Sequence, residues 1–157
     1  MRIQFSLNGQ HREIDVPPDR RVIDLLREDL GLTGAKESCG SGECGSCAIL
    51  VDGEGRLSCL MLAAQLEGRR VTTIEGISGE TGLHPLQESF VNHGAVQCGF
   101  CTPGMVLTGL NLLERNPRPS REEIREAVSG NLCRCTGYQK IVDAIEATSR
   151  KTEESSG

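Results

Sequence analysis

Eight cysteines in two sets of different spacing constrain this chain more than any other feature of its sequence. The first set has the spacing C-x4-C-x2-C-x11-C, and the second joins a C-x2-C pair to a later C-x-C pair. Aromatic residues make up only 3% of the chain, so large core side chains are few. Small domains with so little to bury often need a staple such as a metal or disulfides. The two sets that could supply it are Cys39, Cys44, Cys47 and Cys59, followed by Cys98, Cys101, Cys133 and Cys135.

The remaining composition favours metal ligands over disulfides. The N-terminus has no charged region followed by an apolar stretch, so we find no export signal and expect a cytoplasmic protein. In a reducing compartment, clustered cysteines are typical of metal sites. No apolar run approaches the roughly 20 residues of a membrane-spanning helix. With a net charge of −5 and no long basic stretch, we expect neither a membrane nor a nucleic-acid partner.

The first half predicts a small α+β domain over residues 1–76. Ile3, Phe5 and Leu7 share one face of a strand, and Asn8-Gly9 is a typical two-residue hairpin turn. Further strands are expected at residues 48–51 and 71–74, with Asp52-Gly53 as a second turn.

A helix is expected between the hairpin and the first cysteine loop. Asp19 is placed to cap it, and the apolar residues from Val22 to Leu30 are spaced for one buried face. Gly31 fits the C-terminal cap of such a helix. The first half therefore predicts a mixed sheet with one helix across it.

The second half predicts a helical domain over residues 84–150, after a linker at 77–83. Leu86, Phe90 and Val91 are expected on one face of its first helix, and Thr102-Pro103 begins the second. Ser120 and Glu123 form a capping box for the third, and the fourth begins near Tyr138. Residues 151–157 are polar and are expected to form a disordered tail.

The first cysteine set matches the plant-type ferredoxin spacing for a [2Fe–2S] cluster. Three of its cysteines lie in one tight loop, in which Gly40, Gly42 and Gly45 permit backbone angles that other residues avoid. Such a loop can turn amide N–H groups toward an anionic cluster. A structural zinc site, which usually pairs two short C-x2-C-like knuckles, fits this triplet less well.

The second set is less specific when it is considered alone. A C-x2-C pair occurs in redox dithiols and in zinc sites as well as in clusters. Here Cys98 and Cys101 precede an expected helix start, and Cys133 and Cys135 precede another. Four thiolates on two interhelical loops could therefore meet at one end of a helical bundle, holding either a second cluster or a zinc ion.

Three stretches together resemble the iron–sulfur subunit of the molybdenum hydroxylases, the xanthine oxidase and aldehyde oxidoreductase family. The resemblance runs in order from about residue 2 to residue 147, and all eight cysteine positions match. The stretches are Cys39-Gly-Ser-Gly-Glu-Cys-Gly-Ser-Cys47, Gln97-Cys-Gly-Phe-Cys-Thr-Pro-Gly-Met105 and Gly130-Asn-Leu-Cys-Arg-Cys-Thr-Gly-Tyr138.

The resemblance implies an α+β chain in which a β-grasp ferredoxin-like domain precedes an all-α four-helix domain. It implies that Cys98, Cys101, Cys133 and Cys135 hold the cluster near a molybdopterin cofactor, and that Cys39, Cys44, Cys47 and Cys59 hold the cluster near FAD. Gln97 and Cys135 are then expected to contact the pterin.

The resemblance also implies that this chain turns over no substrate itself. The molybdenum cofactor is expected on a large partner subunit and FAD on another, and this chain relays single electrons between them. Two alternatives remain open at this point: a free-standing two-cluster ferredoxin, which shares every ligand, and a structural zinc protein, which would contain no iron.

Overall fold

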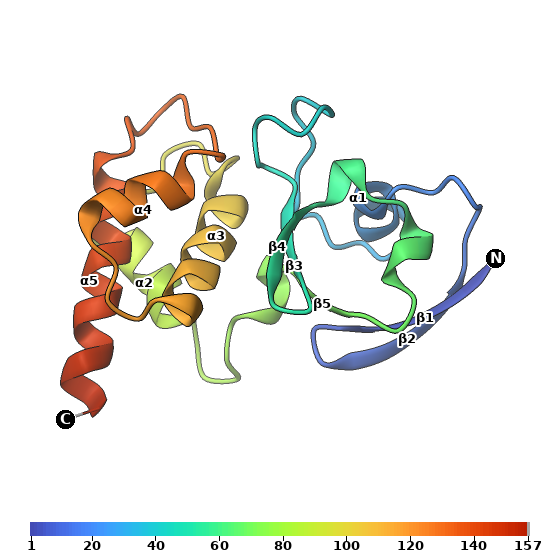
Figure 1. Ribbon diagram of the computed structural model, residues 1–157, viewed down its shortest axis with the longest axis horizontal. Helices are drawn as coiled ribbons and strands as arrows, with labels where there is room; N and C mark the ends of the chain where they lie inside the picture. Colours follow the sequence, from blue (N-terminus) through green and yellow to red (C-terminus); the bar gives the residue numbers. More distant parts are fainter. Residues whose placement is uncertain (157) are drawn as a thin grey trace.

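The computed structural model describes residues 1–156, and its N-terminal half is built on a five-stranded mixed sheet (Figure 1). The strand order is β2-β1-β5-β3-β4; β1 and β5 run parallel, and the other neighbours run antiparallel. Both predicted turns are confirmed, with positive φ at Asn8-Gly9 and at Asp52-Gly53. The strands are β1 (Arg2–Leu7), β2 (Gln10–Asp15), β3 (Ala48–Val51), β4 (Glu54–Leu57) and β5 (Arg70–Thr72).

The predicted helix across the sheet is present, but it begins later than expected. It comprises α1 (Val22–Asp24) and a π-helical continuation, η1 (Leu25–Asp29). The expected cap at Asp19 is wrong, because Arg21 occupies the N-cap position and makes no side-chain capping bond. The Arg21 side chain instead binds the carboxylates of Asp24 and Glu37. Gly31 follows the helix with φ +69°, as its C-cap role requires.

Strand β5 is shorter than predicted, and its end links the two halves of the molecule. The strand stops at Thr72, and Ile74–Gly76 forms a 3-10 turn, η4. Ile74 and Ile77 pack against the core of the helical half. The core of the first half lies between the sheet and α1–η1, where Phe5, Leu25 and Ile49 are fully buried or nearly so. The segment directly after β5 thus leads from the core of the first half to that of the helical half.

The predicted four-helix second domain is confirmed, as is the α+β class of the whole chain. The Ser120–Glu123 capping box is present, with Glu123 N donating to Ser120 Oγ and Ser120 N donating to Glu123 Oε2. Leu86 and Phe90 are buried as expected, but Val91 is 62% exposed. The helices are α2 (Pro85–Asn92), α3 (Thr102–Arg115), α4 (Arg121–Val128) and α5 (Gln139–Ser156).

The expected disordered tail is replaced by helix as far as Ser156. In the last turns of α5, the hydroxyls of Thr148 and Thr152 donate to carbonyls four residues earlier, and such bonds give polar residues partners within a helix. The part of the tail prediction that concerns Gly157 lies outside the described residues. No helix in the described chain is both long and apolar enough to cross a membrane.

The two domains lie side by side, with α3 facing β3 and β4 (Figure 1). Asn111 of α3 donates a hydrogen bond to the carbonyl of Gly53 in the β3–β4 turn. The loops that carry most of the cysteines lie at the upper end of this interface in Figure 1.

Candidate metal centres

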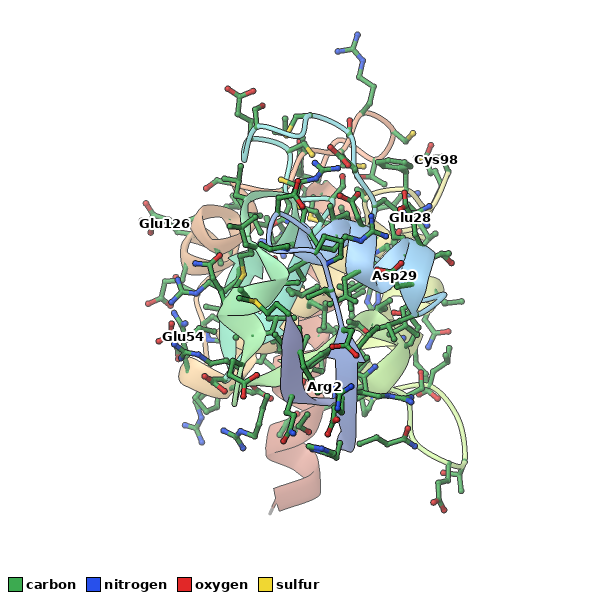
Figure 2. The ribbon with its side chains drawn as sticks, turned by 90° about the vertical axis from the view of Figure 1, so that its right-hand side faces the viewer. Arg2, Glu28, Asp29, Glu54, Cys98 and Glu126 are labelled. Atoms are coloured by element: carbon green, nitrogen blue, oxygen red, sulfur yellow. The ribbon has the colours of Figure 1, made fainter. Side chains whose placement is uncertain are left out.

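Both cysteine sets lie at one end of the molecule. Figure 1 shows the 38–47 loop and the loop between α4 and α5 at the upper edge, and Figure 2 labels Cys98 near the same edge, away from Arg2 and Glu54. All eight cysteines are free thiols. Three are exposed (Cys39, Cys98 and Cys135), Cys133 is half-buried, and four are buried: Cys44, Cys47, Cys59 and Cys101.

The first loop is arranged to stabilise negative charge on sulfur. Gly40, Gly42 and Gly45 all have positive φ, which lets the chain fold tightly around Cys39. The backbone N–H groups of Ser41, Glu43 and Cys44 lie 3.4, 3.3 and 3.4 Å from Cys39 Sγ and donate hydrogen bonds to it. These bonds lower the pKa of Cys39 to about 6, and the bond from Ser41 has the largest effect. The loop therefore favours a thiolate, the form in which cysteine binds metal.

Two further cysteines of the first set pair in the interior. Cys47 precedes β3, and Cys59 lies in the 3-10 turn η2 (Ser58–Leu60). Burial, followed by the hydrogen-bonding Cys59 thiol, raises the pKa of Cys47 to about 11. The hydroxyl of Ser58 donates to the Cys47 carbonyl over 2.7 Å and ties the two segments together. With its pKa raised in this way, the Cys47 thiol would ionise only with a cation beside it.

The second set lines one cavity of about 260 Å³. Cys98, Cys101, Cys133 and Cys135 all contribute to its wall, together with Cys44 and Ser46 of the first domain. This cavity therefore brings a cysteine of the first set against the whole of the second.

The second set consists of an outer pair and an inner pair. The exposed Cys135 has its pKa raised by a hydrogen bond with the neighbouring, also exposed, Cys98. The pKa of Cys101 is raised to about 12, first by burial and then by the adjacent Cys133. Burial also opposes ionisation of Cys133, but hydrogen bonds outweigh it and its pKa is lowered. The Thr136 hydroxyl, 3.1 Å from Cys133 Sγ, provides the largest of these bonds.

The donor set fits two [2Fe–2S] clusters. Each cluster takes four thiolates for two irons, and the thiols here meet in pairs drawn from separate segments. The amide N–H groups that donate to the Cys39 sulfur are the kind of donors that tune such clusters.

Sequence analysis missed two residues that shape the second loop. The Cys133 N–H donates to the Tyr138 hydroxyl over 2.8 Å, and Tyr138 has a φ of +71°, rare for an aromatic residue. Thr136 binds the Cys133 sulfur. The position of Thr136 and Tyr138 directly after the C-x-C pair could have pointed to them. Their bonds to Cys133, however, depend on a turn that the spacing of the residues does not specify.

Gln97 lies in the loop before Cys98, outside any helix, and its side chain is exposed.

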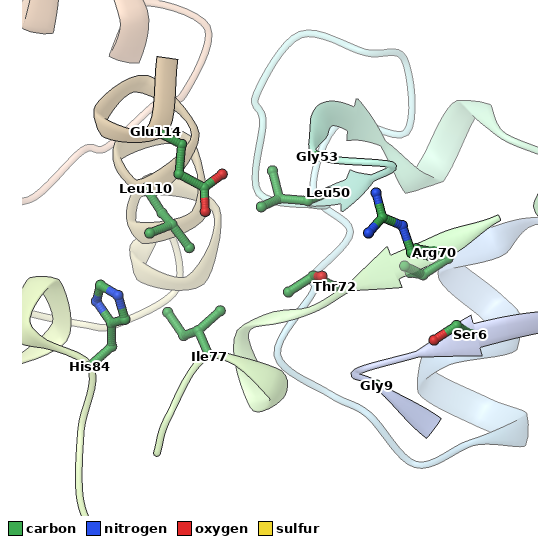
Figure 3. A pocket seen from close by; sticks show the side chains of 11 residues that line it. Ser6, Gly9, Leu50, Gly53, Arg70, Thr72, Ile77, His84, Leu110 and Glu114 are labelled. Carbon is green, nitrogen blue, oxygen red and sulfur yellow. The ribbon is translucent and has the colours of Figure 1, made fainter. Parts of the chain in front are cut away.

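A separate cavity of about 470 Å³ lies between the sheet and the helices, where Arg70 and Thr72 face Leu110 and Glu114 (Figure 3). Neither Gln97 nor any of the eight cysteines lines it, so the sites of interest lie elsewhere.

Comparison with known proteins identifies both domains. Residues 5–73 match the model of a 2Fe-2S iron-sulfur cluster binding domain, and residues 73–146 match that of a [2Fe-2S] binding domain. The chain is 50% identical to the nicotinate dehydrogenase small FeS subunit of Eubacterium barkeri over 143 residues, covering 91% of each chain. It is 51% identical to the nicotine 6-hydroxylase small subunit of Paenarthrobacter nicotinovorans, covering 91% of this chain and 86% of that one.

Solved structures agree with this assignment. Quinoline 2-oxidoreductase from Pseudomonas putida 86 superposes with a TM-score of 0.94 at 51% identity, covering 98% of this chain and 96% of that one. Aldehyde oxidoreductase from Desulfovibrio gigas gives the same TM-score at 37% identity, covering 99% of this chain but 17% of that one. The predicted ferredoxin-like domain followed by a helical domain is thereby confirmed. The chain belongs to the family of the small [2Fe–2S] subunits of the molybdenum hydroxylases, which includes the xanthine dehydrogenases and aldehyde oxidoreductases.

Proposed function

We propose that this chain relays single electrons from a molybdopterin site on a large partner subunit, through two [2Fe–2S] clusters, to FAD on a second partner. The observation that carries the proposal is the shared cavity, in which Cys44 of the first set stands against all four cysteines of the second. When bound, a [2Fe–2S] cluster accepts and releases one electron at a time. A relay requires two such groups to be adjacent, and candidate ligands of both sets line this one cavity at the domain interface.

The candidate ligands are the eight cysteines, each set holding one cluster. Cys39, kept ionised by three amide N–H groups, would bind without first losing a proton at neutral pH. Buried Cys47 and Cys101 would release protons as metal binds, because their pKa values are raised. The free thiols of the described chain also support a cytoplasmic location, which we propose with the function.

The direction of the relay is proposed from exposure. The outer pair, Cys98 and Cys135, faces solvent, and the exposed apolar side chains of Phe100 and Leu132 line the same cavity. Exposed apolar groups of this kind are typical of a partner surface. We propose that the molybdenum subunit covers this face, with Cys135 and Gln97 next to the pterin.

The first set has an apolar surface of its own. Leu60, directly after Cys59, is 60% exposed, and nearby Leu62 is 43% exposed. We propose that the FAD-binding partner covers this second face. Two cysteine sets with separate apolar surroundings suit a subunit that lies between two partners better than a free carrier with a polar surface.

Gln97→Ala tests the pterin-side assignment. We expect the assembled enzyme to retain both clusters and to be reduced by substrate several-fold more slowly, because an exposed amide at the interface is lost while no ligand changes. Stopped-flow absorbance under substrate, with iron analysis of the same sample, measures both quantities. Gln10→Ala, the same change on exposed strand β2, is the control. Reduction at the wild-type rate in both variants would remove Gln97 from the pterin contact.

A further inference from the structure

Asn131 connects segments that carry candidate ligands, although it cannot bind iron itself. It is a polar residue that is only 6% exposed. Its Nδ2 donates to the carbonyl of Gly45, in the first cysteine loop, over 3.1 Å. Its Oδ1 accepts from Thr108 Oγ1, on α3, over 3.0 Å. Both ends of the amide are therefore satisfied, one in each domain.

There is no room for a further side chain where the Asn131 amide meets the first cysteine loop. A Cβ added to Gly45 would lie 2.5 Å from the Gly130 carbonyl oxygen and 2.7 Å from Asn131 Nδ2. A Cβ added to Gly104, one turn before Thr108 on α3, would lie 2.5 Å from the Gly45 carbonyl oxygen. Glycine at both positions lets the Asn131 amide reach the backbone of the first loop.

The residue after Asn131 completes the connection. Leu132 N donates to the carbonyl of Cys44 over 2.8 Å. Residues 131 and 132 thus hold Cys44 and Gly45 and lead directly into Cys133. The same short segment positions a candidate ligand of each cluster relative to the other.

We propose that Asn131 is a positioning residue that fixes the separation and relative orientation of the two clusters, and so sets how fast electrons pass between them. This inference rests on the proposed relay. Without the amide, the buried Gly45 carbonyl loses its side-chain donor and the Thr108 hydroxyl loses its acceptor, so the two loops can move apart. The cysteines of both sets are unchanged, so both clusters remain.

The test uses the full chain with its clusters, as wild type, Asn131→Ala and Thr108→Val. Electron paramagnetic resonance of the fully reduced protein reports the magnetic interaction between the two clusters, which depends on their separation and orientation. In the assembled enzyme, the rate at which the second cluster of the relay becomes reduced reports electron transfer. We expect Asn131→Ala to keep wild-type iron, weaken the interaction and slow transfer several-fold. Thr108→Val should shift both in the same direction by less.

Asn111→Ala is the matched control, because it removes an asparagine side-chain bond from α3 to the β3–β4 turn of the first domain, and that turn carries no cysteine. It should leave the interaction and the rate unchanged. Equal changes in Asn111→Ala and Asn131→Ala would overturn the inference, as would a wild-type interaction in Asn131→Ala. If Asn131→Ala loses iron, Thr108→Val tests the inference instead, through its magnetic interaction and its rate of electron transfer. A wild-type interaction and rate in Thr108→Val would then overturn the inference. A wild-type chain without two clusters would instead contradict the proposed relay itself.

Discussion

Cys59→Ser is expected to abolish the cluster of the N-terminal domain and spare that of the helical domain, so that iron falls from about four to about two per chain. Cys101→Ser should give the same iron content with the opposite cluster lost. The reason is that each of these two thiols is buried and pairs with a second cysteine of its own domain, Cys47 and Cys133 respectively. Iron analysis and the electron paramagnetic resonance spectrum of the remaining cluster make the measurement.

The same two variants test the order of the relay, and each serves as the control for the other. In the assembled enzyme, substrate should still reduce the helical-domain cluster of Cys59→Ser, with turnover lost beyond it. In Cys101→Ser, substrate should no longer reduce the N-terminal cluster at a useful rate. The reverse result would mean that the first domain, and not the second, faces the molybdenum subunit.

Gly45→Ala is expected to destabilise the protein more than a comparable change elsewhere. Its φ of +72° disfavours any side chain, at a cost of roughly 1–2 kcal/mol. The clash of the new Cβ with Gly130 and Asn131 adds about 1–3 kcal/mol. In a chain of this size, each kcal/mol lowers Tm by about 2–4 °C.

Gly68→Ala provides the matched control for this prediction. Gly68 has nearly the same φ, +71°, but nothing lies within 4 Å of an added Cβ. Its Tm should fall only by the backbone contribution, and the difference between the two variants isolates the contact between domains. The Tm of both variants is measured by circular dichroism with the clusters bound. Equal losses of Tm would show that the close approach at Gly45 does not exist in solution.

Local chemistry explains why so much of the fold could be predicted from the sequence. The hairpin at Asn8-Gly9 and the capping box at Ser120 depend on neighbouring residues, and both are present. Strand β4 was not expected, because its residues are mostly exposed and show no apolar pattern. Asp19 was expected to cap a helix, but ion pairing of Arg21 favours a later start. Tertiary contacts thus override local preference at this end of the helix.

The candidate site, like the fold, has one part that the sequence predicts and another that depends on tertiary contacts. The spacing of the eight cysteines identifies both sets, because each loop is local. The pairing of Cys47 with Cys59 depends on how the first domain folds, and the convergence of both sets on one cavity depends on how the two domains dock. The bond from Asn131 to Gly45 joins residues 86 positions apart, so no local sequence pattern could predict it. The sequence therefore predicts the candidate ligands, whereas only the structure relates one set to the other.

The most direct test of the central claim is the amount of iron and acid-labile sulfide per chain, together with the electron paramagnetic resonance spectrum of the reduced protein purified with its partners. We predict about four irons, equal sulfide and two distinct [2Fe–2S] signals. Zinc without sulfide would contradict the account, and a single cluster would leave one of the two cysteine sets without the role assigned to it.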